Sequence, residues 1–140
     1  MIDTVIFGAG RSGEKFVYQY FGEINIKCFW DNRKSGELLG YQVKKPEAGK
    51  KYFIIVAVAE YLEIRKQLIG MGYHEFDDFI PTQIFKKKMA IAYGNCHMNT
   101  VKAYLECKKD FSSEVGFYPF PVIQKLKEMD LACKDILNHC

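Results

Sequence analysis

The sequence predicts an α/β protein, in which a unit built on a parallel sheet is followed by a second, truncated α/β unit. The strand Val5-Ile6-Phe7 leads through a glycine-rich turn into a segment with helical periodicity. Residues 52–59 form an unbroken apolar run rich in β-branched side chains, as expected of a central parallel strand covered on both faces. The strand, turn and helix pattern starts again at residue 89, after a run of three lysines at 86–88. We therefore expect a first unit at 1–85, a linker at 86–88 and a second unit at 89–140.

Two helices are expected in the first unit from the spacing of their apolar residues. The first spans about 12–21 and ends at Gly22, and the second spans about 61–71 and is stopped by Gly72. The side chains expected to face inward from these helices are Phe16, Val17, Tyr20, Phe21, Leu62, Leu68 and Ile69.

Three further strand segments complete the expected first unit. Residues 26–30 form a strand, and residues 38–43 form a short, irregular strand-like piece after a polar loop. Residues 74–80 are expected to form an edge strand closed by Pro81, because proline cannot donate to a neighbouring strand.

The second unit is expected to open with a strand at 89–93, a turn at 94–97 and a helix. A strand at 115–120 and an amphipathic helix at 121–140 follow. The inner face of the first of these helices is expected to carry Met98, Val101, Tyr104 and Leu105. Tyr104 and Lys108 also match a YxxxK spacing, which we interpret as a chance match in the wrong unit.

A GxGxxG motif lies between the first strand and the first helix, where a phosphate-cradling turn requires it. The first glycine permits a tight turn, the second lets the backbone approach a pyrophosphate, and the third lets the helix pack on its strand. Asp31 follows the second strand about 20 residues beyond the turn, the spacing of an acid that accepts hydrogen bonds from a ribose. The candidate ligand residues are Gly8, Gly10, Arg11, Ser12, Gly13 and Asp31.

A purely structural interpretation stays open for the same residues. The glycines would then only shape a turn, and Asp31 would only open the following loop, since Asp-Asn-Arg-Lys-Ser-Gly is itself turn chemistry. The ligand interpretation predicts NAD or a nucleotide-sugar, and the sequence does not choose between them because nothing in it identifies the base or the sugar.

Composition excludes several classes of protein. A formal net charge of +3 with scattered lysines gives no basic stripe for nucleic acid. No apolar stretch approaches the roughly 20 residues of a membrane span, and no signal peptide is seen, so we expect a cytoplasmic protein. The five cysteines include no CxxC, which predicts neither a disulfide framework nor a metal site.

Cys96 is the best candidate nucleophile because it falls at the expected start of a helix. The free amides and positive dipole end of a helix favour thiolate over thiol and attract anions. His97 is adjacent and is a candidate ligand contact or base. The structural alternative is that Asn95 caps the helix while Cys96 packs beneath it.

The first unit resembles the small Rossmann-like module at the front of many bacterial polysaccharide and sugar-modifying enzymes. The resemblance covers residues 1–81 and rests on the GAGxxG turn, the Asp-Asn strand end at 31–32 and the Gly-Tyr-x-Val piece at 40–43. It implies binding of a nucleotide or nucleotide-sugar. It does not imply dehydrogenase chemistry, because the module is half of a full dinucleotide fold.

The second unit resembles the opening of the WcbI-type polysaccharide biosynthesis family, which has a strand, a G-N-C-[HQ] turn and a helix. The match is carried by Gly94, Asn95, Cys96 and His97 and covers about 50 residues. The family looks like an SGNH-hydrolase variant with Cys in place of the nucleophilic Ser. The resemblance implies coenzyme A or acetyl-coenzyme A as ligand, with Cys96 as nucleophile, His97 beside it and Asn95 as a ligand contact.

Two functions therefore remain open from the sequence. The chain is the N-terminal part of an acyltransferase-like surface-glycan enzyme, or it is a non-catalytic nucleotide-binding module that regulates or recruits a partner. The expected last helix leads to no further strand, so we expect a second domain cut at Cys140, which leaves open whether the chain is active alone. An unpaired sheet edge in such a unit would permit a homodimer.

Overall fold

The computed structural model describes residues 2–92 and 96–119, without the side chains of residues 96 and 97. The chain divides into two compact units, Met1–Phe85 and Lys86–Cys140. The described residues confirm the mixed α/β class. They form a mostly parallel six-stranded sheet with two helices in the first unit, and a two-stranded sheet with two helices in the second. Within these residues, no helix combines the length and apolar character needed to cross a membrane.

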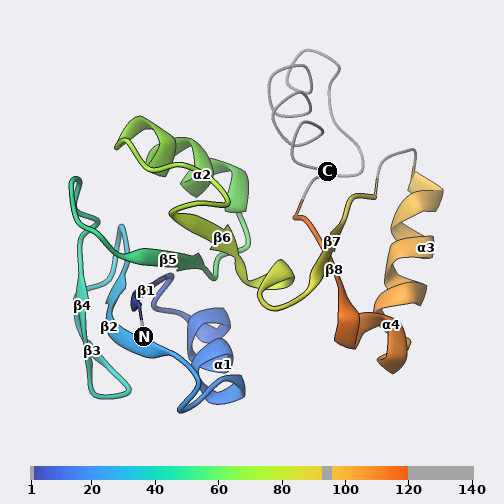
Figure 1. Ribbon diagram of the computed structural model, residues 1–140, viewed down its shortest axis with the longest axis horizontal. Helices are drawn as coiled ribbons and strands as arrows, with labels where there is room; N and C mark the ends of the chain where they lie inside the picture. The colour runs from blue at the N-terminus through green and yellow to red at the C-terminus, as the bar shows by residue number, and fades with distance from the viewer. Residues whose placement is uncertain (1, 93–95, 120–140) are drawn as a thin grey trace. The chain divides into compact units, whose positions relative to one another are not determined.

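The first unit is built on one sheet with the strand order β3-β4-β2-β1-β5-β6 (Figure 1). Neighbouring strands are parallel except for β3, which pairs antiparallel with β4. The strands are β1 (Asp3–Phe7), β2 (Asn25–Trp30), β3 (Gly36–Leu38), β4 (Tyr41–Lys44), β5 (Phe53–Val56) and β6 (Phe79–Pro81). The strong apolar runs form the middle of this order, because only central strands are covered on both faces.

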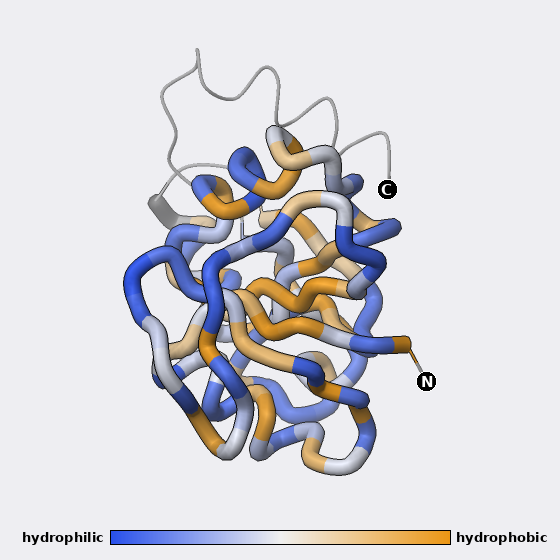
Figure 2. Tube along the Cα trace, turned by 90° about the vertical axis from the view of Figure 1, so that its left-hand side faces the viewer, coloured by the Kyte–Doolittle hydropathy of each residue, from blue (hydrophilic) through white to orange (hydrophobic). Residues whose placement is uncertain are grey.

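Two helices cover opposite faces of the sheet, as Figure 1 shows. Helix α1 (Arg11–Gln19) buries Phe16 and Val17 against alternate residues of the strands. Helix α2 (Tyr61–Gly70) buries Tyr61 and Leu68. Figure 2 shows the hydrophobic stretches running through the middle of the strands, with hydrophilic residues in the connections. The sheet is therefore the middle layer of a three-layer unit.

The expected inner faces of these helices were partly wrong. Phe16, Val17 and Leu68 are buried, but Phe21 is 78% exposed and Ile69 is 43% exposed. Helix α1 ends at Gln19, so Phe21 no longer follows its periodicity. Tyr20 and Leu62, which were also expected to face inward, are half-buried.

Phe85 takes part in closing the core beside α1. A short 3₁₀ turn, η1 (Thr82–Ile84), follows β6 and brings its ring to 5.2 Å from Phe16 and 4.9 Å from Tyr20, centroid to centroid. The residue that ends the first unit therefore packs on its first helix.

The piece expected at 38–43 is a regular hairpin of β3 and β4. Leu39 and Gly40, between the two strands, have φ values of 52° and 81°. Two consecutive residues with positive φ form the turn whose twist matches that of the flanking strands. The expected single, irregular strand-like piece is therefore two short paired strands, because a turn at Leu39 and Gly40 divides it.

The edge strand expected at 74–80 was also too long, because β6 covers only Phe79–Pro81. The residues before it form a turn in which the backbone amide of His74 donates to Asp78 Oδ2 at 2.7 Å. Phe76 has φ of 70°, which a strand does not allow.

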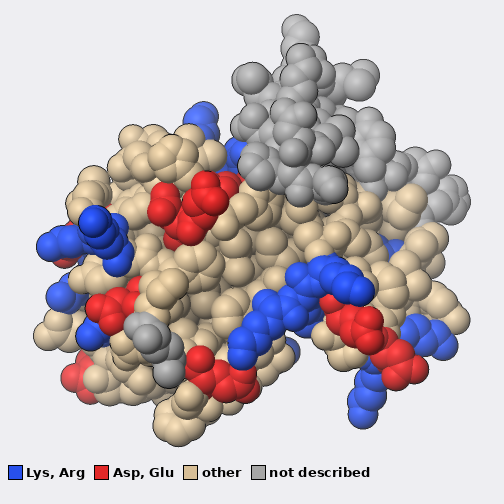
Figure 3. All heavy atoms as spheres, viewed as in Figure 1, with Lys and Arg blue, Asp and Glu red and all other residues tan. Residues whose placement is uncertain are grey.

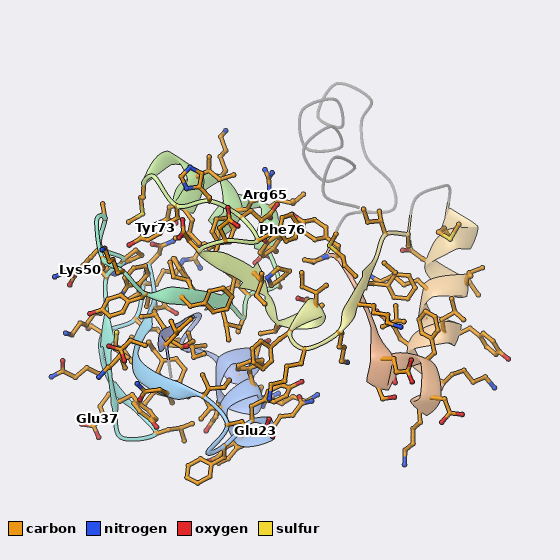
Figure 4. The ribbon with its side chains drawn as sticks, in the orientation of Figure 1. Glu23, Glu37, Lys50, Arg65, Tyr73 and Phe76 are labelled. Carbon is orange, nitrogen blue, oxygen red and sulfur yellow. The ribbon has the colours of Figure 1, made fainter. Side chains whose placement is uncertain are left out.

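A buried polar cluster joins this turn to α2. The Tyr61 hydroxyl donates to Glu75 Oε2 at 2.5 Å, and Arg65 Nε lies 3.0 Å from both carboxylate oxygens. Figure 4 labels Arg65 on α2 and Phe76 in the facing turn. Glu75 is 9% exposed, and a buried carboxylate is tolerated only when it is paired and hydrogen-bonded.

The second unit contains β7 (Lys88–Ala90), α3 (Cys96–Glu106), α4 (Lys109–Glu114) and β8 (Val115–Phe117). The two strands are parallel. Strand β7 begins at Lys88, inside the expected linker, β8 is shorter than expected, and α4 was not expected. The helix expected at 121–140 lies outside the described residues.

Among the described residues of the second unit, the core is small. Ala92 and Phe117 are buried, with Met98, Leu105 and Phe111 packed against them. Val101 and Tyr104 were expected to face inward, but they are 48% and 62% exposed. The apolar residues of α3 are spread over more than one face of the helix. The face that carries Met98 and Leu105 packs against β8 and α4, and the face with Val101 and Tyr104 stays exposed.

Candidate functional site

The order of the strands reverses between β1 and β5. The chain builds from β1 to one side through β2 and β4, and then returns to the other side of β1 with β5 and β6. In open α/β sheets, ligands bind outside the carboxyl ends of the strands at such a reversal. The turn that follows β1 therefore lies at the position where the topology favours a ligand.

Two of the three motif glycines are required by close packing. A Cβ at Gly13 would lie 2.0 Å from the Gly8 carbonyl oxygen, and a Cβ at Gly8 would lie 2.5 Å from the Ala57 carbonyl oxygen. Gly8 also has φ of +120°. No side chain fits at either position, so these glycines hold α1 against β1 and the turn against the end of β5.

Gly10 differs from the other two glycines. Its φ of −115° is accessible to any residue, and within 4 Å an added Cβ would meet only Lys34 Nζ, at 3.8 Å. Gly10 is the N-cap of α1, and no side chain caps the helix. The sequence predicts that a ligand approaches the backbone in this open space, and that contact stays a prediction.

The first turn of α1 supplies the remaining candidate contacts. Arg11 and Ser12 are exposed, and the Gly10 carbonyl accepts the first helical hydrogen bond from Glu14 N at 3.0 Å. The amides of the first helical residues have no carbonyl partner within a helix, so they can receive an anion. Glu14 is the acidic residue of this turn.

The Asp31 carboxylate binds backbone amides of both the turn after β1 and the loop after β2. Its Oδ2 accepts from the Ala9 amide at 3.0 Å, and its Oδ1 accepts from the amides of Arg33 and Lys34, both at 2.8 Å. Burial alone would raise the pKa of Asp31. The three amides and the Lys34 charge outweigh that effect and hold the pKa below its usual value. The predicted ribose contact stays a prediction.

Lys34 is a site residue that the sequence reasoning missed. Its ammonium donates to the Ala9 carbonyl at 2.9 Å, so Lys34 and Asp31 hold the carbonyl and the amide of the same residue. The sequence shows only two basic residues after Asp31 and Asn32. Which of them turns back to the glycine turn depends on the path of the loop.

The loop after β2 is also tied to its neighbours. Asn32 and Gln67 exchange two amide hydrogen bonds, at 2.8 and 3.0 Å, and thereby join this loop to α2. The Lys45 ammonium donates to the Asn32 carbonyl. The Asn32–Gln67 pair holds in place the segment that carries Asp31 and Lys34.

In the second unit, α3 begins at Cys96, which places that residue at a helix start as expected. Gly94 and Asn95 lie outside the described residues, as do the side chains of Cys96 and His97. The predicted thiol site therefore stays a prediction. The YxxxK pair forms a surface contact, with the Lys108 ammonium 4.8 Å from the Tyr104 ring centroid.

A cavity of about 570 Å³ lies at the amino-terminal ends of β1 and β5, away from the glycine turn. Several of its polar groups are already engaged nearby. Lys50 lies 3.6 Å from Glu47 Oε2, and the Tyr73 hydroxyl donates to the Glu47 carbonyl at 2.6 Å. Figure 4 labels Lys50 and Tyr73. The cavity brings none of the predicted ligand residues together.

On one face of the described residues, the charged side chains do not gather into a further site. On the face shown in Figure 3, acidic and basic side chains are interspersed. Within residues 2–92 and 98–119, no group of three or more His, Cys, Asp or Glu side chains is placed to hold a metal ion. The two cysteines with described side chains, Cys28 and Cys107, are free thiols.

Comparisons with known proteins give no match to this chain, whether with protein-family models, curated protein sequences or solved structures. A functional assignment therefore rests on the residues and the geometry described above.

Replacing Gly13 by Ala should lower the free energy of unfolding by roughly 3 kcal/mol, because the new methyl group would overlap a backbone oxygen. Gly10→Ala is the matched control and should change it by no more than about 1 kcal/mol, the cost of alanine at an N-cap. Urea unfolding followed by fluorescence of the buried Trp30 measures both. Equal losses in the two variants would contradict the different roles of these glycines.

Replacing Asp31 by Asn should destabilise the protein at neutral pH and have less effect in acid. A lowered folded-state pKa gives stability that is present above the usual carboxyl pKa and is lost as pH falls through the folded value. The difference in the free energy of unfolding between wild type and Asp31→Asn should therefore become smaller below about pH 4. Urea unfolding at several pH values tests this, and a difference independent of pH would contradict it.

Proposed function

We propose that residues 1–85 form a Rossmann-like module that binds a nucleotide or nucleotide-sugar, with the ligand's diphosphate on the turn from Gly8 to Gly13. The observation that carries the proposal is the contrast among the motif glycines. Gly8 and Gly13 are explained by packing, whereas Gly10 is next to open space at an uncapped helix start. A turn with only a structural role does not require glycine at that position.

The strand order supports the same proposal. The parallel strands β4, β2, β1, β5 and β6 follow the 3-2-1-4-5 order of nucleotide-binding sheets, with β3 added at one edge. The glycine turn follows the strand at which this order reverses. Arg11, Ser12 and the first amides of α1 would then contact the phosphate oxygens. NAD and a UDP-sugar both carry a diphosphate, so this geometry serves either class.

For the second unit we propose the thiol chemistry implied by the WcbI-type resemblance. Cys96 starts α3, where amides and the helix dipole favour a thiolate. That thiolate would attack the acyl carbonyl of acetyl-coenzyme A and form an acyl thioester on Cys96, while the acyl carbon–sulfur bond to coenzyme A breaks and coenzyme A leaves as its thiolate. His97 and Asn95 would lie near the ligand. The chain would then belong to an acyltransferase-like enzyme of surface-glycan synthesis. The alternative is a nucleotide-binding module that regulates or recruits a partner.

Isothermal titration with NAD and with UDP-N-acetylglucosamine tests the first unit. We expect one of them to bind, and Gly10→Val to weaken it about tenfold or more, because a branched side chain would occupy the space beside the turn and cost hydrogen bonds to a charged ligand. Gly70→Val is the matched control, since an added Cβ there meets nothing within 4 Å. Binding that is unaffected by Gly10→Val, or no binding, would contradict the proposal.

Alkylation by iodoacetamide at pH 7 tests Cys96 against internal controls. We expect Cys96 to react about tenfold faster than the exposed Cys107, because a helix start lowers a thiol pKa. Cys28 should react slowest, since it is 6% exposed and burial raises the pKa of its thiol. Peptide mapping by mass spectrometry gives the three rates. A Cys96 rate equal to that of Cys107 would favour the non-catalytic alternative.

A further inference from the structure

The Asp31 carboxylate has little capacity left for a ribose. A carboxylate offers about four acceptor positions. Oδ1 uses two of them for the amides of Arg33 and Lys34, and Oδ2 uses one for the amide of Ala9. One acceptor position on Oδ2 remains, whereas accepting hydrogen bonds from both hydroxyls of a ribose requires two acceptor positions. Most of the acceptor positions of Asp31 are therefore used by backbone amides of the chain, and little capacity is left for a ligand.

Those hydrogen bonds shape the turn and the loop at once. The bond to Ala9 fixes the residue between Gly8 and Gly10, and the bonds to Arg33 and Lys34 fold the loop back toward the turn. Asp31 thereby sets the backbone position from which the Lys34 side chain starts. The Asp31 amide itself donates to the Lys44 carbonyl at 2.9 Å, which anchors the group to β4.

The Lys34 ammonium lies at the place where a ligand on the turn would carry negative charge. Its Nζ is 3.8 Å from the position of a Cβ on Gly10, the closest atom to that position. Of its three N–H donors, one is used by the Ala9 carbonyl at 2.9 Å. The others can donate to a phosphate without any movement of the ammonium. Lys34 is exposed, so a ligand can reach it from solvent.

On the basis of the proposed nucleotide function, we infer that Lys34 contacts the ligand's phosphate and that Asp31 is a positioning residue that holds Lys34 and the turn. The module then recognises a nucleoside diphosphate or its sugar ester through its phosphates, and the ribose hydroxyls contribute little. Arg11 and Lys34 supply the positive charge at this end of α1, where Glu14 is the opposing carboxylate. The expected ligand is therefore an organic diphosphate, and the module tolerates changes to the hydroxyls of its sugar.

Titration of ADP and UDP, and of their 2′,3′-dideoxy forms, into wild type and Lys34→Met tests the inference. For each base we expect the ribose and dideoxy forms to bind wild type within about threefold of each other. Lys34→Met should weaken both forms about tenfold, because it removes a charge-assisted hydrogen bond and keeps the side-chain length. It should also reduce the salt dependence of binding.

Lys45→Met is the matched control. Lys45 is also exposed, and its ammonium also donates to a backbone carbonyl of the loop, at Asn32, but it does not border the glycine turn. This variant should bind as wild type does. Asp31→Asn should weaken both forms of a ligand by the same factor, as expected of a positioning residue. A ribose contact would instead weaken only the form that has hydroxyls.

The outcomes separate the two proposals. Binding of a diphosphate that survives Lys34→Met, or that falls equally in Lys45→Met, overturns the role of Lys34 and leaves the nucleotide function standing. A preference of tenfold or more for the ribose form that Asp31→Asn abolishes overturns the role of Asp31. Failure of wild type to bind ADP, UDP, NAD and UDP-N-acetylglucosamine overturns the nucleotide function and the inference together.

Discussion

The contact between the first turn of α1 and the end of β1 is the constraint on which the first unit depends. The absent side chain of Gly13 lets the helix backbone reach the Gly8 carbonyl, and no other residue leaves that room. This approach sets the helix close enough to the sheet for Phe16 and Val17 to be buried. It also directs the uncapped start of the helix to the carboxyl edge of the strands, where the order of the sheet reverses. Packing and the candidate site therefore depend on the same contact.

Two carboxylates organise the polar groups at two places in this unit. Glu75 is almost fully buried and is held by Tyr61 and Arg65, so it joins α2 to the turn before β6. Asp31 is more open and binds three backbone amides, so it joins the turn after β1 to the loop after β2. In both cases at least one donor belongs to another segment of the chain: α2 supplies Tyr61 and Arg65 to Glu75, and the turn after β1 supplies the Ala9 amide to Asp31. Each carboxylate thereby fixes a tertiary contact that apolar packing alone would leave loose.

The residues at the carboxyl edge separate into a set that supports the turn and a set that has space or donors left for the proposed ligand. Gly8, Gly13 and Asp31 have contacts within the chain that account for their residue types. Gly10, Lys34 and the exposed first residues of α1 have open space or unused donors beside them. On the proposed function, this division would let one short motif both pack the helix on its strand and bind the ligand. The cavity at the opposite edge of the sheet has no comparable division, because groups such as Lys50 and Tyr73 already have partners in the adjoining loop.

Local sequence patterns were enough to predict the α/β class, the central strands, the first helix and the place of the glycine turn, because each depends on local periodicity or on the freedom of glycine. It predicted Asp31 as a site residue from spacing alone. Three features could not be predicted from local patterns. Phe21 and Ile69 are exposed, residues 36–44 form a hairpin, and Lys34 turns back to Ala9. Those features depend on contacts between segments distant in the chain. A local pattern is compatible with several such contacts, and the packing of the whole unit selects one of them.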